Sequence, residues 1–191
     1  NKDENGIPKD GIPFHPYYTV KDIFGVGVFL IFFCAVIFFA PEMGGYFLEA
    51  PNFEPANPLK TPEHIAPVWY FTPFYAMLRA VPPMFGSQFP GVVVMFASIL
   101  LFFFLPWLDR SPVKSIRYKG PLFKIALAIF VVTFIVLGYL GVVASTHMVL
   151  GIVEASVLAP IFTIIYFLFF LLMPIYSKMD KTKPVPERVT K

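Results

Sequence analysis

Four long apolar runs constrain this chain more than any other feature of its sequence. They cover about residues 23–40, 91–107, 122–141 and 152–176, and almost no charged side chain falls within them. A helix needs about 20 apolar residues to cross about 30 Å of hydrocarbon. Of the 191 residues, 57% are hydrophobic and 14% are charged, whereas soluble domains are about 45–50% apolar and about 25% charged. The sequence therefore predicts an all-α integral membrane protein with four transmembrane helices.

Prolines mark the ends of these runs. We expect Pro41 to end the first helix and Pro174 to close the fourth. Pro160 falls inside the fourth run, but a proline can kink a spanning helix without breaking it. We therefore expect residues 152–176 to form one span.

The charged residues predict the orientation of the spans. Four cations and one acid lie between the second and third runs, and the tail at 177–191 is also basic. The connection at 41–90 is acidic, with four glutamates against Lys60 and Arg79. Because cytoplasmic loops are enriched in Lys and Arg, we expect both the N-terminal segment 1–22 and the tail 177–191 to be cytoplasmic. The 41–90 loop would then be periplasmic.

The long outer loop is expected to contain two short interfacial helices. The first would start with Thr61 as N-cap and Pro62 at the first helical position, and Pro67 would end it. The second would run from about residue 72 to 80. Trp and Tyr favour the membrane interface, so the aromatic hinge between these helices has two readings. It is either an aromatic belt or the rim of an apolar pocket for a flat hydrophobic ligand.

Several classes of site are disfavoured by the residues themselves. A single cysteine, Cys34, excludes an internal disulfide and a cysteine-based metal cluster. We expect no metal site, and the basic pI reflects loop charges rather than a nucleic-acid-binding surface. Because the chain begins at Asn1 without an initiator Met, we expect it to be a piece of a longer protein or a separately encoded half.

The order of short motifs along the chain resembles a known family. The outer loop contains Asn57-Pro58-Leu59, Thr61-Pro62, His64-Ile65, Pro67, Trp69-Tyr70 and Phe74-Tyr75-Ala76. Before it comes Ile12-Pro13-Phe14-His15-Pro16-Tyr17-Tyr18 with Lys21-Asp22, and after it comes Pro106-Trp107-Leu108-Asp109-Arg110-Ser111-Pro112. Together these motifs resemble the C-terminal half of cytochrome b, the quinone-reactive membrane subunit of ubiquinol–cytochrome c oxidoreductase. The match covers essentially the whole chain.

This resemblance implies quinone redox chemistry at two sites, coupled to proton translocation. Quinol oxidation at the outer face would send electrons to a Rieske iron–sulfur protein and a b haem, and quinone would be reduced at the inner face. The family's outer pocket carries over to Ile65, Pro67, Val68, Trp69, Tyr70, Phe71 and Tyr75, with Met95 as a further member. The inner quinone site carries over to Phe14, Tyr18, Lys21 and Asp22.

The sequence departs from the family at Val68. Most members have an acid between this proline and Trp-Tyr, and that acid binds quinol and helps to remove a proton. Valine can do neither, although some proteobacterial members carry it. We therefore expect another group to accept the proton, with Glu54 first, followed by Tyr75, Glu49 and Glu63.

The resemblance also implies the cofactors and partners. Two b haems are expected in the complex, bound by the N-terminal half of cytochrome b and not by this chain. Ubiquinone is the expected substrate. The implied partners are that N-terminal half, the Rieske protein, a c-type cytochrome, a second copy of the complex and the lipid bilayer, and the implied location is the bacterial inner membrane. The alternatives are a transporter, which the lack of paired ionisable residues in the spans disfavours, and a non-redox membrane anchor.

Overall fold

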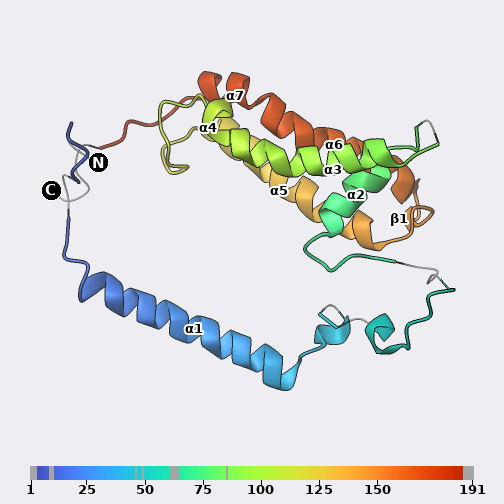
Figure 1. Ribbon diagram of the computed structural model, residues 1–191. Helices are drawn as coiled ribbons and strands as arrows, with labels where there is room; N and C mark the ends of the chain where they lie inside the picture. Colours follow the sequence, from blue (N-terminus) through green and yellow to red (C-terminus); the bar gives the residue numbers. More distant parts are fainter. Residues whose placement is uncertain are drawn as a thin grey trace. The chain divides into compact units, whose positions relative to one another are not determined.

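The structure is a computed structural model that describes residues 4–8, 11–45, 47–48, 50–60, 65–84 and 86–186. The chain divides into two units, Asn1–Ala56 with Pro184–Lys191, and Asn57–Lys183. Figure 1 shows the helices of each unit. The two units are described separately below.

The first unit is built on one long helix, α1 (Tyr17–Phe39), followed by the short 3-10 turns η1 (Met43–Gly45) and η2 (Ala50–Phe53). α1 begins earlier than the apolar run because Tyr18 N–H already donates to Phe14 O at 2.8 Å. Its last helical residue precedes Ala40, which leaves the helical region at φ −146°. This end is expected, because the residue before a proline, here Pro41, disfavours helical angles. None of the side chains of α1 is buried.

The second unit is a bundle of helices. Its elements are α2 (Thr72–Ala80), α3 (Phe89–Leu100), η3 (Leu101–Phe104), α4 (Leu105–Leu108), α5 (Pro121–Val142), β1 (Met148–Val149), β2 (Val153–Glu154), α6 (Ala155–Leu171) and α7 (Met173–Met179). α2 lies toward the end of the bundle that carries β1, whereas α4 and α7 lie at the opposite end (Figure 1).

The count of spanning helices is three or four among the described residues. By length and composition, Tyr17–Phe39, Phe89–Leu108 and Pro121–Val142 could each cross a membrane, and α6 with α7 adds a fourth if this bent pair is one span. Pro160 lies inside α6 without interrupting it, as the sequence predicted. The bend of 56° instead falls between α6 and α7, where Pro174 cannot donate a backbone hydrogen bond.

The outer loop differs in part from its expectation. α2 occupies the range expected for the second short helix. Residues 61–64 lie outside the described part, and residues 65–68, where the first helix was expected to end, are not helical. Pro67 explains this locally, because a following proline drives Ala66 out of the helical region. Residues 148–154 form a two-stranded hairpin, so α6 starts at Ala155 rather than near residue 152.

The core of the second unit lies where α2, α5 and α6 meet. Met77, Leu137, Tyr166 and Phe170 are fully buried. The Tyr166 hydroxyl donates to Ser98 O at 3.0 Å, so the most buried polar side chain of α6 ties that helix to α3. A buried hydroxyl needs such a partner, since leaving it unpaired costs about 1–3 kcal/mol.

Asp180 makes hydrogen bonds at the end of the bundle where α5 begins, opposite the end that carries α2. This residue is only 9% exposed, and its carboxylate accepts hydrogen bonds from Gly120 N–H at 2.6 Å and Leu122 N–H at 3.1 Å. These amides belong to the start of α5, where backbone N–H groups otherwise have no helical partner. A side chain on Gly120 would overlap the Asp180 carboxylate, so the glycine is what lets the acid reach the helix end.

Replacing Asp180 should therefore loosen this end. We expect Asp180→Ala to lower the free energy of unfolding by about 1–3 kcal/mol, because it removes a charged acceptor from two amides. Asp180→Asn should cost less, since it keeps one acceptor oxygen. The measurement is unfolding of the purified protein in mixed micelles, with the exposed Glu42→Gln as control. Equal stability of Asp180→Ala and the control would contradict this role.

Candidate functional site

The outer candidate site is built on the hinge that leads into α2. Residues 65–68 have no regular secondary structure, and Phe71 N–H then donates to Val68 O at 2.8 Å to make a tight turn. The buried Thr72 hydroxyl donates to Trp69 O at 2.7 Å, which fixes the turn against the first residue of α2. The hinge backbone is thus held by its own hydrogen bonds.

The aromatic side chains of this turn pack on one another and remain accessible. The Trp69 and Tyr70 rings meet edge to face at 5.4 Å between centroids, and Tyr70 and Phe71 lie 4.8 Å apart. All three are about half exposed, as are Ile65 and Val68. Half-exposed aromatic and aliphatic groups on a fixed turn offer the kind of apolar lining that ligand sites use.

α2 itself is held tightly in the bundle. Thr72, Pro73, Ala76 and Met77 are buried. Gly141 of α5 lies so close to the Thr72 carbonyl that any side chain there would overlap it, and a side chain on Gly91 of α3 would likewise overlap the Leu78 carbonyl. Gln88 completes the contact by donating its amide N–H to the Leu78 and Val81 carbonyls at 3.1 and 3.0 Å.

Arg79 adds a polar anchor that sequence reasoning missed. Its guanidinium donates to Leu140 O at 2.5 Å and Val143 O at 3.0 Å. These carbonyls end α5, where a cation is favoured by the helix dipole. The same guanidinium lies 4.8 Å from the centre of the Tyr75 ring. The sequence feature that could have indicated this role is a single cation in a short helix that is otherwise without charge.

The structure brings most of the predicted outer residues together. Ile65, Pro67, Val68, Trp69, Tyr70 and Phe71 form the hinge, and Tyr75 follows one turn into α2, where its N–H donates to Phe71 O at 3.0 Å. Met95 lies on α3, which packs against α2, and is partly buried. Of the other predicted proton acceptors, Glu54 is exposed and belongs to the first unit. Glu49 and Glu63 lie outside the described residues.

The inner candidates lie at the start of α1. Phe14 and Tyr18 stack with ring centroids 5.9 Å apart. Lys21 and Asp22 follow three and four residues after Tyr18, so all three share one face of the helix. Each of the four side chains is exposed within its unit. They form an aromatic pair beside one cation and one carboxylate, a set that can contact a ring and exchange a proton with its oxygen.

The described residues do not fit a haem site. Haem iron is held by an axial side chain such as histidine, and neither of the two described histidines lies within a spanning helix. His15 precedes α1 and contacts the Thr19 hydroxyl, whereas the His147 ring contacts the Tyr139 hydroxyl at 3.2 Å in a loop. Among the described residues there is also no group of three or more side chains able to hold a metal ion.

Comparisons with known proteins now define the class. The model of the family described as "Cytochrome b(C-terminal)/b6/petD" matches residues 55–167. Cytochrome b of Allochromatium vinosum is 68% identical over 190 residues, which cover 100% of this chain and 44% of the relative. Cytochrome b of Rhodospirillum rubrum is 47% identical and is matched over 42% of its length. This chain therefore belongs to the C-terminal cytochrome b family, as its motifs predicted.

A solved structure supports the same assignment. A chain of the "Hyperthermophilic respiratory Complex III" is 39% identical, superposes with a TM-score of 0.75, and is similar over 93% of this chain and 41% of its own length. The chain thus spans less than half the length of the relatives it matches. Membership in an electron-transport membrane family follows from these matches.

The close approach of α2 and α5 gives a sharp prediction. Gly141→Ala should displace α2 and its hinge, because the added methyl overlaps the Thr72 backbone. Overpacking of this kind typically costs about 1–3 kcal/mol. Gly138→Ala is the matched control, because the same methyl would meet Pro73 and Thr72 side-chain atoms at an ordinary 3.7 Å. Unfolding in mixed micelles should separate the two variants; equal stability would show that the helices adjust freely.

Proposed function

We propose that this chain is the quinone-binding part of the membrane subunit of a cytochrome bc complex in a bacterial inner membrane. It contributes to quinol oxidation at the outer face and to quinone reduction at the inner face, with proton translocation between them. Electrons pass to a Rieske protein and to b haems bound by the N-terminal half of cytochrome b. A c-type cytochrome and a second copy of the complex complete the assembly.

The observation that carries this proposal is the aromatic hinge on a closely packed helix. Trp69, Tyr70 and Phe71 present half-exposed rings, and α2 behind them is fixed by Gly91, Gly141 and Arg79. Catalysis gains from holding a substrate in one geometry, and a flat ubiquinol ring suits an aromatic surface. A simple membrane belt needs aromatic side chains at the interface but has no need of so rigid a support.

The inner quinone site is proposed on α1. Phe14 and Tyr18 supply ring contact, and the Asp22 carboxylate on the same face is the group that can relay a proton to a quinone oxygen. Lys21 beside it favours the anionic oxygen of a reduced ring.

Both tryptophans of the chain give a test that separates a quinol site from an aromatic belt. Trp69 is in the hinge and Trp107 is in α4, with 54% and 72% of their surfaces exposed. In the intact complex we expect Trp69→Ala to raise KM for quinol in quinol–cytochrome c reductase assays, because it removes ring contact. Trp107→Ala should leave KM unchanged. Similar effects of both changes would favour the belt and defeat the proposed site.

The missing acid at Val68 leaves the proton acceptor to be assigned. We propose Glu54, whose side chain is exposed just after η2, with Tyr75, Glu49 and Glu63 as the next choices. Val68 is 43% exposed, so a larger acidic side chain at this position has room to point outward. A restored acid should therefore be tolerated.

These statements combine into a rescue experiment. Glu54→Gln should slow quinol oxidation by on the order of a hundredfold and flatten its pH profile, because a general base is lost. Val68→Glu alone should retain activity, and adding it to Glu54→Gln should restore much of the rate. Glu42→Gln, another exposed acid of the first unit, is the control. An unchanged rate and pH profile in Glu54→Gln would remove Glu54 as the acceptor.

A further inference from the structure

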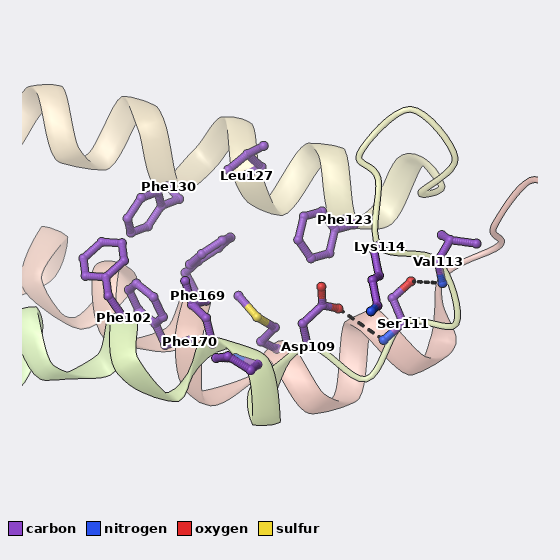
Figure 2. A pocket seen from close by; sticks show the side chains of 13 residues that line it. Phe102, Asp109, Ser111, Val113, Lys114, Phe123, Leu127, Phe130, Phe169 and Phe170 are labelled. Carbon is purple, nitrogen blue, oxygen red and sulfur yellow. Dashed lines mark hydrogen bonds between the residues drawn. The ribbon is translucent and has the colours of Figure 1, made fainter. Parts of the chain in front are cut away.

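A cavity lies at the end of the second unit opposite α2. It occupies about 710 Å³ between α4, α5 and the α6–α7 pair, within the range of about 300–1,000 Å³ typical of small-molecule sites. Figure 2 shows its lining. None of the predicted quinone-site residues contributes to it, because the lining side chains are Phe102, Leu105, Pro106, Asp109, Ser111, Val113, Lys114, Phe123, Leu127, Phe130, Phe169, Phe170 and Met173.

The inner wall of this cavity is aromatic and closely packed. Phe130 stacks on Phe169 with ring centroids 4.4 Å apart, and Phe102 meets Phe170 edge to face at 5.2 Å. Phe170 and Met173 are almost completely buried. These phenylalanine rings pack against one another and also line the cavity. The interior of the cavity is therefore apolar. Such an interior favours a hydrocarbon chain.

The mouth of the cavity is polar, and its acid is already neutralised. Asp109 forms an ion pair with Lys119, the one ion pair among the described residues, and Lys119 is only 3% exposed. The Lys119 ammonium also lies 3.6 Å from the centre of the Phe123 ring. Asp109 accepts a further hydrogen bond from Ser111 N–H at 3.1 Å. The Asp109 carboxylate is therefore paired within the loop and does not need Lys114 as a partner.

Lys114 is the cation left over at this mouth. Figure 2 shows its side chain extending from the loop toward Asp109 and Ser111. It is exposed, and within the described part of the chain it has no carboxylate partner. Ser111 Oγ accepts from Val113 N–H at 3.4 Å, so its own proton can still be donated. Arg110 and Arg117 in the same loop add to the positive field.

An apolar cavity with a cationic mouth is complementary to an anionic amphiphile, whose hydrocarbon chain fits the interior and whose charged headgroup fits the mouth. We propose that it binds an anionic membrane phospholipid, with one acyl chain among the phenylalanines and the phosphate against Lys114 and the Ser111 hydroxyl. Basic pockets between spanning helices are suited to such headgroups, and a charge-assisted bond to phosphate is stronger than a neutral one. A neutral quinone ring would gain less from an unpaired ammonium. This inference depends only on a membrane-embedded bundle and not on the proposed quinone chemistry.

The test uses the intact complex purified in mild detergent. Phospholipid retained after washing is counted by native mass spectrometry in competition between phosphatidylglycerol and phosphatidylcholine. We expect Lys114→Gln to lower the preference for phosphatidylglycerol by about fivefold, the effect of one cation near an anionic lipid. Lys114→Arg should keep the preference. The control Lys178→Gln, an exposed lysine of α7 that does not line the cavity, should leave it unchanged.

A second variant tests the cavity separately from its mouth. Leu127→Trp fills the space with a side chain from α5, so it should release both lipids while the complex still assembles and oxidises quinol. If the parent and Leu127→Trp complexes retain equal amounts of lipid, another part of the complex occupies the cavity and the proposal is wrong. An unchanged headgroup preference in Lys114→Gln would equally overturn it.

Discussion

The contact between α2 and α5 is the constraint on which the rest of the second unit depends. Gly141 allows the Thr72 backbone to reach the α5 surface, and Arg79 reaches the terminal carbonyls of α5 from the other end of α2. A short helix of nine residues would be marginal alone, because most helical stability in proteins comes from packing. The close approach at Gly91 and Gly141 and the hydrogen bonds of Arg79 hold α2 against α3 and α5. The hinge aromatics directly precede α2, so this packing also positions them.

The sequence predicted the helices that depend on hydropathy and proline. The continuity of α6 through Pro160, the end of α1 before Pro41 and the helix at 72–80 all follow from local rules. It could not place the bend between α6 and α7 or the hairpin before Ala155, because these depend on which groups lie nearby in the fold. An apolar run shows which segment can lie in hydrocarbon. The exact residues at which a helix ends depend instead on hydrogen bonds that the run does not reveal.

The candidate sites divide in the same way. The hinge residues are nearly consecutive in the chain, so a single motif identifies them together. Arg79 and Asp180 were not predicted as contacts, since their partners lie about sixty positions away along the chain. The phospholipid cavity is harder still, because its lining comes from several helices and the intervening loop. Periodicity cannot show that these phenylalanines leave a space between them.

The clasp formed by Asp180 bears on how the protein is made. Gly120 and Leu122 precede Asp180 by 60 and 58 residues, so a growing chain exposes the start of α5 long before its acceptor has been synthesised. Until α7 leaves the ribosome, those amides must rely on water or on the lipid surface. Asp180, the residue that directly follows α7, therefore completes the hydrogen bonding at the start of α5, and a chain truncated before residue 180 would insert α5 without that acceptor.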